Sequence, residues 1–309
     1  MKQHKSKKSV VCFGEILWDN LPTGRRPGGA PMNVAYHLHK LGLESQLISS
    51  IGNDASGEEL MGFFTEIGLK TDLVQVDQEH ATSEVLASVN PSNHEVTYDI
   101  VSPVAWDFIR WQPNFETLLN EAQAFVFGTL SARNITSRNT LYKMLDHSAY
   151  RVFDVNLRAP HYSQEVIDAL LQKSNMVKLN SSELLLIAQW YNPSCVKEAE
   201  CVEVLFKRFN IDEVLITKGS QGATYYTALF RYDYPAYKVS VADTIGSGDS
   251  FLAAFLAMKL GDEPVEITLD YAVAMGAFIT SQAGACPQYS KFDLERFIWK
   301  KKLGISDPA

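Results

Sequence analysis

Short apolar runs alternate with helix-like segments along most of this chain, and this alternation restricts its fold more than any other feature. Apolar runs of strand length are followed by longer stretches in which apolar residues recur at helical spacing. Two strands joined through a helix lie parallel, and a parallel sheet is buried under helices on both faces. The sequence therefore predicts an α/β fold with a mainly parallel central sheet.

The expected elements follow from these patterns. We expect strands at residues 10–13, 45–51, 124–128, 151–155, 176–179 and 213–217. We expect helices at residues 33–41, 57–67, 137–148, 163–173, 181–190, 195–209, 250–260 and 269–281. The stretch between the first strand and Pro31 is rich in glycine and proline, which predicts a loop.

Two hairpins interrupt the alternation. Residues 83–89 and 94–101 alternate in strand fashion around Asn90-Pro-Ser-Asn93, and residues 223–226 and 230–234 form a second such pair. Because the first hairpin departs from the strand–helix order, we expect it to leave the main sheet as a lid.

Composition narrows the function classes. Of the 309 residues, 46% are hydrophobic and 21% charged, and open α/β folds of this length often form one domain, here residues 1–309. The net charge of −8 argues against general nucleic-acid binding. No apolar stretch has membrane-spanning length, and the four cysteines show no metal-ligand spacing. We expect a cytoplasmic protein without membrane or nucleic-acid partners.

Residues 241–256 contain a glycine turn that leads into a helix. Gly246, Ser247 and Gly248 would present free N–H groups and the helix dipole to an anion, with the glycines allowing its close approach. Asp249 would repel a phosphate at rest, but it suits a base that takes a proton from an attacking hydroxyl. The segment thus suggests phosphoryl transfer to an alcohol. Taken alone, such a segment is more often a turn with an aspartate N-cap.

Polar residues near the N-terminus suit a polyol substrate. Asp19 and Asn33 can accept and donate hydrogen bonds to hydroxyl groups, and Gly28 and Gly29 would let the substrate approach the backbone. The alternative is that Asp19 lies in a turn and that Asn33 caps a helix.

A polar cluster follows the strand expected at 151–155, at the edge where such sheets bind ligands. Asp154 and Asn156 would fall on the same side of that strand. Arg158 would contact a phosphate or, equally, pair with Asp154.

Two more clusters follow later strands. Asn180 and Glu183 match a capping box, or would lie near hydrated Mg²⁺ and phosphate. Thr217, Gly219 and Gly222 bracket a turn that would lie along the phosphates of a nucleotide or simply turn the chain.

Together these motifs resemble the ribokinase-like (PfkB) carbohydrate kinases. The stretch from Gly28-Gly-Ala-Pro-Met-Asn33-Val-Ala35 to Gly52 resembles that family's first signature, and Asp243-Thr-Ile-Gly-Ser-Gly-Asp249 resembles its second. The resemblance runs from about Val10 to about Gln288. It implies a ribokinase-like fold with a lid formed by about residues 15–30 and 83–101, through which two copies form a homodimer.

The resemblance also implies roles for residues. Asp249 would be the general base, beside an anion hole for the γ-phosphoryl group. That hole would comprise Gly246, Ser247 and Gly248. With the residues discussed above, the expected sugar contacts are Asp19, Gly28, Gly29, Asn33, Asp154 and Arg158. ATP would contact Asn180, Glu183, Thr217, Gly219 and Gly222. Glu183 would reach Mg²⁺ through water, and Asp243 would organise a monovalent-cation site, which binds potassium in many members.

Within the family, Gly-Gly-Ala-Pro-x-Asn, Trp106-Asp107 and Asp-x-Asn-x-Arg most resemble fructokinases, whereas Ser247 and Lys218 depart from the usual residues. We expect an ATP- and Mg²⁺-dependent sugar kinase that acts on fructose. 2-Keto-3-deoxygluconate kinase and ribokinase are the alternatives, and a nucleoside kinase is less favoured. Rivals of other classes are a non-catalytic sugar-binding protein, which would not need Asp249, and a nucleotide-binding oxidoreductase.

Overall fold

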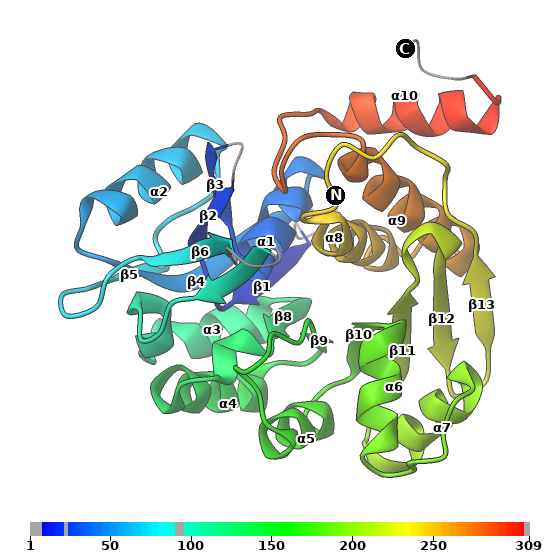
Figure 1. Ribbon diagram of the computed structural model, residues 1–309, viewed down its shortest axis with the longest axis horizontal. Helices are drawn as coiled ribbons and strands as arrows, with labels where there is room; N and C mark the ends of the chain where they lie inside the picture. Colours follow the sequence, from blue (N-terminus) through cyan, green and yellow to red (C-terminus); the bar gives the residue numbers. More distant parts are fainter. Residues whose placement is uncertain (1–7, 22–23, 90–95, 306–309) are drawn as a thin grey trace, which may run out of the picture.

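The central element of the structure, a computed structural model that describes residues 8–21, 24–89 and 96–305, is a nine-stranded sheet (Figure 1). Its strands are, in spatial order, β13 (Arg231–Tyr234), β12 (Ala223–Thr227), β11 (Glu213–Thr217), β10 (Met176–Asn180), β9 (Arg151–Asp154), β8 (Ala124–Gly128), β1 (Ser9–Phe13), β4 (Glu44–Gly52) and β5 (Val74–Asp77). The pairs β11–β12 and β12–β13 are antiparallel, and the other neighbours are parallel. The predicted mainly parallel sheet is confirmed.

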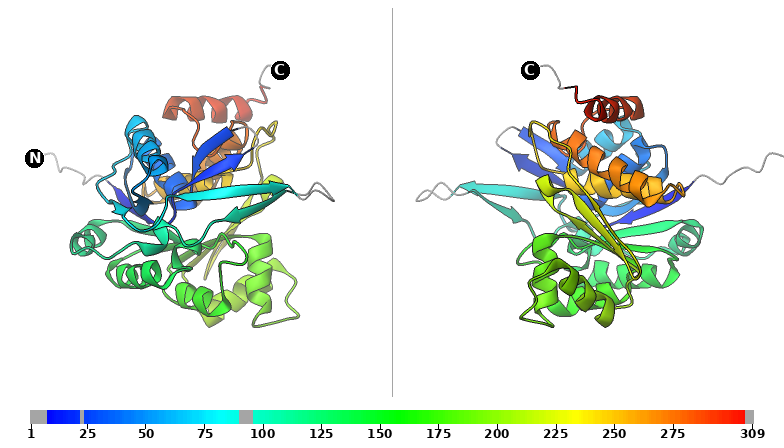
Figure 2. Two further views of the ribbon diagram at one scale, coloured as in Figure 1. Left: turned by 60° about the vertical axis from the view of Figure 1, so that its left-hand side comes forward. Right: turned by 90° about the vertical axis from the view of Figure 1, so that its right-hand side faces the viewer.

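Helices cover both faces of this sheet (Figure 2). One face is covered by α1 (Ala30–Lys40), α2 (Ala55–Glu66), α8 (Ser247–Lys259), α9 (Val265–Thr280) and α10 (Lys291–Lys302). The other is covered by α3 (Asn114–Glu121), α4 (Ile135–His147), α5 (Gln164–Gln172), α6 (Ser181–Gln189) and α7 (Glu198–Arg208). In β1, Val10 and Cys12 belong to the first core, and Val11 and Phe13 belong to the second. Burial on both faces explains why the central strands are continuous apolar runs.

A second sheet forms the lid, with strands in the order β3 (Gly24–Gly28), β2 (Leu17–Leu21), β6 (Ser83–Val89) and β7 (Val96–Ile100). The hairpin expected at 83–101 is confirmed as β6 and β7, which project from the body in Figure 2. Its turn at 90–95 lies outside the described residues. The loop expected before Pro31 is wrong, because this stretch forms the β2–β3 hairpin and β2 pairs with β6. An edge strand such as β3 tolerates the glycine and proline that suggested a loop.

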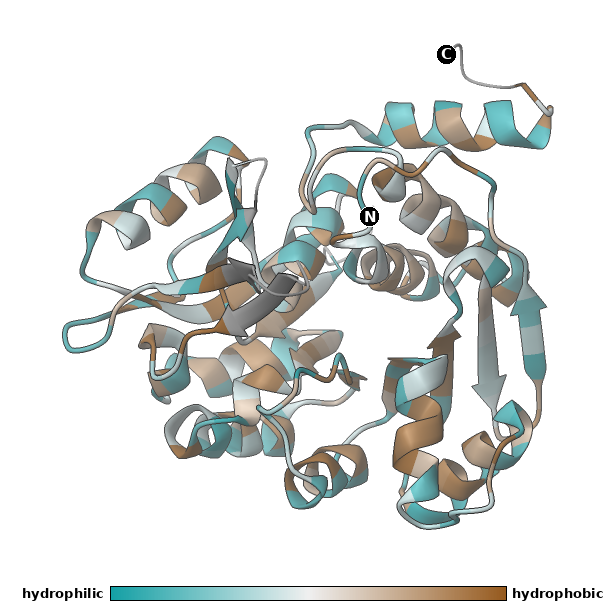
Figure 3. Cartoon of the chain, in the orientation of Figure 1, coloured by the Kyte–Doolittle hydropathy of each residue, from teal (hydrophilic) through white to brown (hydrophobic). Residues whose placement is uncertain are grey.

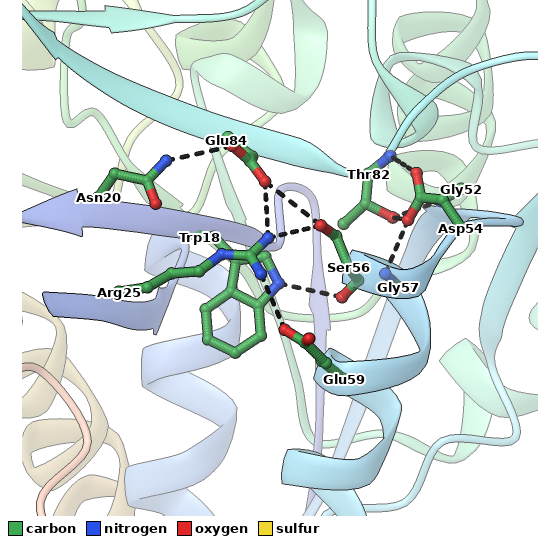
Figure 4. Close-up of polar contacts among 10 residues, drawn as sticks. All are labelled: Trp18, Asn20, Arg25, Gly52, Asp54, Ser56, Gly57, Glu59, Thr82 and Glu84. Atoms are coloured by element: carbon green, nitrogen blue, oxygen red, sulfur yellow. Dashed lines mark hydrogen bonds and ion pairs between the residues drawn. The ribbon is translucent and has the colours of Figure 1, made fainter.

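A polar network around Arg25 joins the lid to α2 (Figure 4). Arg25 on β3 lies 2.8 Å from Glu59 and 2.6 Å from Glu84, and it also donates to the Ser56 hydroxyl. Its guanidinium carbon lies 4.3 Å from the centroid of the Trp18 ring, and the Trp18 indole N–H donates to the backbone of Ser56. The network therefore ties β2, β3 and β6 to one turn of α2.

Asp54 provides a second connection at the start of α2 (Figure 4). It caps the helix by accepting from the backbone N–H of Gly57, and it also accepts from the backbone N–H and hydroxyl of Thr82, each at 2.7 Å. Thr82 immediately precedes β6, so Asp54 fixes both the start of α2 and the segment that enters the lid.

Several boundaries differ from the expectation. The helix expected from residue 33 begins at Ala30, because proline is well tolerated in a first turn, and the helix expected from residue 250 begins at Ser247. The patterns do not predict β5, α3 or α10; α10 is largely hydrophilic in Figure 3 and has a weak apolar stripe. Among the described residues, no helix is both long and apolar enough to cross a membrane.

Candidate active site

A cavity of about 940 Å³ lies where the carboxyl ends of the parallel strands face the lid. The predicted residues that line it are Asp19, Gly29, Asn33, Arg158, Asn180, Glu183, Thr217, Asp243, Gly246, Gly248 and Asp249. Five other predicted residues are not part of its wall: Gly28, Asp154, Ser247, Gly219 and Gly222. The fold thus brings candidate residues from both ends of the chain into one cavity.

The start of α8, which is the predicted anion site, borders this cavity. Gly246 is the N-cap and α8 begins at Ser247, so the interpretation of Asp249 as an N-cap is wrong. No side chain of the described residues caps the helix, which leaves first-turn N–H groups for a ligand. The Ser247 hydroxyl donates to the backbone oxygen of Gly276 on α9, at 3.2 Å, and so anchors the turn.

Packing requires glycine at the first position of the turn and leaves little room at the second. Gly246 has a left-handed φ of 75°, and a Cβ on it would lie 2.6 Å from the Cβ of Ala285. A Cβ on Gly248 would lie 3.1 Å from Nζ of Lys178. Packing therefore explains Gly246, whereas at Gly248 the absence of a Cβ leaves room for the Lys178 ammonium.

Asp249 lies in the first turn of α8 and faces the cavity. Its Oδ2 accepts a hydrogen bond of 2.7 Å from the amide of Asn33 on α1. Burial raises the pKa of Asp249 to about 6, although the positive charge of Lys178 and the Asn33 bond act against that rise. Asp249 is therefore a carboxylate near neutral pH whose affinity for a proton suits a general base.

Asn33 and Asp19 mark the end of the cavity nearest the lid. Asn33 lies inside α1 and is 3% exposed, so its interpretation as a helix cap is wrong. Asp19 lies on β2, and a Cβ on Gly28 would come within 2.2 Å of its Oδ2, so Gly28 makes room for this carboxylate. Burial raises the pKa of Asp19 to about 6, against the attraction of Arg158. Both side chains are placed to bind hydroxyl groups.

Glu15 is a cavity residue that the sequence patterns do not predict. One oxygen accepts from the backbone N–H of Ala30 at 3.1 Å, and the other has no hydrogen-bond partner among the described residues. Burial raises the pKa of Glu15 to about 7. Its position in the sequence could have identified it, because Glu15 comes two residues after the buried strand β1, at the edge of the sheet where ligands bind.

Asp154 pairs with Lys178 and not with Arg158. Both carboxylate oxygens of Asp154 lie 2.9 Å from Nζ of Lys178, and both side chains are buried. Arg158 is exposed and lines the cavity. Strand β9 ends at Asp154 and Asn156 has a left-handed φ of 38°, so the alternation expected to align these two residues does not apply.

Asn180 and Glu183 form the predicted capping box at the start of α6. The Asn180 side chain accepts from the backbone of Ser182 and Glu183, and the Glu183 carboxylate accepts from the backbone N–H groups of Asn180 and Leu157, each at 2.8 Å. Burial raises the pKa of Glu183. Both residues line the cavity while they form the capping box, so the cap does not exclude their predicted role near Mg²⁺ and phosphate.

The turn after β11 also borders the cavity. Thr217 lines the cavity, whereas Gly219 and Gly222 lie beyond its wall, with left-handed φ values of 54° and 98°. Nζ of Lys218 pairs with Glu198 on α7 at 2.7 Å, so this residue holds the turn against α7.

Asp243 connects two loops beside the anion site. One oxygen accepts from the backbone N–H of Ile245 at 3.0 Å, and the other from that of Gly284 at 3.1 Å. It therefore fixes the turn before α8 to the loop that follows α9.

The loop at 284–289 is in turn held by α1. His37 is fully buried, and burial lowers its pKa to about 3, so the ring is neutral. One ring nitrogen donates to the backbone oxygen of Ala285 at 2.9 Å, and the other accepts from the Tyr289 hydroxyl at 3.0 Å. The Tyr36 hydroxyl donates to the backbone oxygen of Pro287. Helix α1 thus supports the anion site as well as contributing Asn33.

Comparisons with known proteins place this arrangement in a family. The model of the pfkB family carbohydrate kinases matches residues 7–291. Probable fructokinase-5 of Arabidopsis thaliana is 26% identical over 306 residues, covering 90% of this chain and 93% of that protein. The fructokinase of Xylella fastidiosa, solved with bound ATP, has a TM-score of 0.83 at 22% identity, covering 96% of this chain and 99% of that one.

A second solved structure shows that the fold is shared more widely. The aminoimidazole riboside kinase of Salmonella enterica, complexed with aminoimidazole riboside and an ATP analog, has a TM-score of 0.80 at 22% identity. The likeness covers 94% of this chain and 100% of that one. Because the family model spans most of its length, this chain belongs to the pfkB family of carbohydrate kinases, which are phosphotransferases.

Proposed function

We propose that this carbohydrate kinase uses MgATP to phosphorylate fructose, with Asp249 as the general base. The observation that carries the proposal is the hydrogen bond between Asn33 and Asp249. It joins a side chain suited to a sugar hydroxyl to a carboxylate at the start of a helix, beside free backbone N–H groups. A hydroxyl bound at Asn33 would therefore lie next to both a proton acceptor and an anion site.

The reaction follows from this placement. Asp19 and Asn33 would hold the sugar, and Asp249 would take the proton from the hydroxyl oxygen as that oxygen attacks the γ-phosphorus. The bond between that phosphorus and the terminal oxygen of ADP breaks, and the oxygen leaves with the electron pair. The N–H groups at the start of α8 would stabilise the negative charge on the transferred group. The lid would exclude water, which competes as an acceptor.

The residues near Glu183 fit a hydrated Mg²⁺ that arrives with ATP. Among the residues that the structure describes, no group of three or more His, Cys, Asp and Glu side chains is arranged to hold a metal. Mg²⁺ retains several waters and needs only one or two carboxylates plus phosphates. The Glu183 oxygens each have a lone pair left for such a water. Bound Mg²⁺ would neutralise charge on the phosphate oxygens.

Potassium activation is part of the proposal. Asp243 would act by holding the loops at 243–246 and 284–289 in place rather than as a sole ligand. Replacing K⁺ by choline in the assay should then lower kcat; an unchanged kcat would remove this part of the proposal.

Fructose is supported by the relatives named fructokinase, and 2-keto-3-deoxygluconate and ribose are the alternatives. The test is ADP release with MgATP and a panel of fructose, ribose, 2-keto-3-deoxygluconate and aminoimidazole riboside. We expect the highest kcat/KM for fructose. A higher value for another acceptor would replace fructose alone, whereas no turnover on any sugar would overturn the kinase activity and favour a non-catalytic sugar-binding protein.

We also propose that two copies pair through the lid. Leu86 on β6 is 45% exposed, and the lid is a small sheet with open edges. Light scattering should then give a mass of twice 34.5 kDa, and Leu86→Lys should halve it. A wild-type protein of single-chain mass would contradict this pairing.

A further inference from the structure

Lys178 on β10 is a buried cation at the phosphoryl end of the cavity. Its side chain is 8% exposed, and the residue lines the cavity. Its ammonium lies 2.9 Å from each oxygen of Asp154, and it approaches Gly248 so closely that a Cβ there would lie 3.1 Å from Nζ. The ammonium therefore lies against the backbone of the anion site at the start of α8.

The ammonium has a donor to spare. A lysine ammonium carries three N–H donors, and Asp154 accepts two of them. Among the described residues no other acceptor is bound to Nζ, so the third N–H is free for a ligand in the cavity. A buried donor without a partner is costly, which makes an incoming anion its natural acceptor.

The charges around Lys178 keep it protonated. Burial acts to lower the pKa of Lys178, but the negative charges of Asp154 and Asp249 outweigh it and raise that pKa. Asp154 neutralises the cation at rest, so the site does not depend on an anion for its folded state. A phosphate brought to the start of α8 would nonetheless meet a charged donor there.

We propose that Lys178 is a further catalytic residue, whose free N–H donates to an oxygen of the γ-phosphoryl group from ATP binding through transfer. Asp154 is its positioning residue, which fixes the direction of the ammonium. Lys178 retains its proton throughout, while Asp249 takes the sugar proton and ADP leaves with the electron pair. This inference rests on the proposed function, because it needs the γ-phosphoryl group to lie at the start of α8.

The competing explanation is that Lys178 only neutralises Asp154. Both explanations predict that removing Lys178 harms the enzyme, because an unpaired buried carboxylate is destabilising and would repel phosphate. The two explanations predict different activities once the Asp154 charge is removed as well. They also differ in whether the loss of affinity is confined to nucleotides that carry a γ-phosphate.

The test uses Lys178→Met, which retains the length of the side chain, and the double variant Lys178→Met/Asp154→Asn, which removes both charges. We expect kcat to fall about 100-fold in both, as for the loss of one oxyanion donor. Affinity for the non-hydrolysable analogue AMP-PNP should fall about tenfold, because a charged hydrogen bond to the γ-phosphate is lost, while affinity for ADP stays unchanged. Calorimetry measures both affinities, and circular dichroism checks the fold.

Three outcomes would overturn the proposal. The first is recovery of wild-type kcat in the double variant, and the second is a double variant that binds AMP-PNP and ADP as the wild type does. The third is an equal loss of affinity for both nucleotides. If Lys178→Met does not fold, the double variant decides alone. If the wild type phosphorylates no sugar, the proposed function fails, and the nucleotide affinities still decide the role of Lys178.

Discussion

The two ends of the cavity are built from different parts of the fold. The end proposed to bind the phosphoryl group combines backbone N–H groups at the start of α8, a helix of the main core, with the side chains of Asp249 and Lys178. The end nearest the lid depends on side chains, and Asp19 comes from a separate sheet that reaches the body through Arg25 and Asp54. Under the proposed function, the core would therefore set the reaction, and the attached lid would contribute to the choice of acceptor.

Under the proposed function, this difference would let the acceptor change while the anion site stays the same. A backbone anion site would change only if the helix moved, and Gly246 at the start of this helix packs closely against Ala285. Side chains on the lid change by single substitutions that leave the core intact.

The largest expected effect is that of Asp249→Asn at the phosphoryl end. The amide keeps the shape of the side chain but cannot take a proton, so kcat should fall about 1,000-fold. Binding of ATP, measured by calorimetry, should be nearly unchanged. Turnover close to that of the wild type would remove Asp249 from the role of base.

A smaller effect, and one on KM, is expected for Asp19→Ala at the opposite end. Loss of a charged hydrogen bond should raise the sugar KM about tenfold to 100-fold, and leave the KM for ATP unchanged. An unchanged sugar KM would count against the assignment. If Asp19→Ala instead lowered kcat as much as Asp249→Asn, the division between the two ends would be wrong.

The pH dependence of kcat should separate the two carboxylates. Burial raises the pKa of Asp249 to about 6, and the base works only when ionised, so kcat should be constant above pH 7 and fall about tenfold per unit below 6. Asp19→Asn should retain this acidic limb, although the pKa of Asp19 is also about 6. A limb near pH 4 in the wild type would show that Asp249 is not the titrating base.

The smallest effect is expected where the lid joins α2. The Arg25 side chain is 30% exposed, so Arg25→Ala should cost less than about 1 kcal/mol of folding stability. It should raise the sugar KM a few-fold by loosening the lid, with kcat unchanged. Arg296→Ala, which removes another exposed ion pair, is the control and should leave the sugar KM unaltered.

Local signals predicted much of the fold and the glycine turn that leads into α8. Strands such as β1 and β8 are buried on both faces and read as apolar runs, and the Gly-Ser-Gly-Asp turn is contiguous. The partnership of Asp154 with Lys178 was not predictable, because it depends on which strands become neighbours. Nor did any local pattern indicate that one Glu15 oxygen would have no partner among the described residues. The β2–β3 hairpin was hidden because its residues suit turns as well as an edge strand.

The contacts between α1 and the loop at 284–289 set an order of events during synthesis. Asn33, Tyr36 and His37 meet partners that lie 216 to 253 residues later in the chain. A ribosome adds about 5–20 residues per second, so these partners emerge well after α1 does. Until then α1 can pack only against early elements such as β1 and β4, and these polar contacts of Asn33, Tyr36 and His37 cannot form. Under the proposed function, a nascent chain that ends before residue 249 lacks the base, and one that ends before residue 289 lacks contacts between α1 and the loop at 284–289.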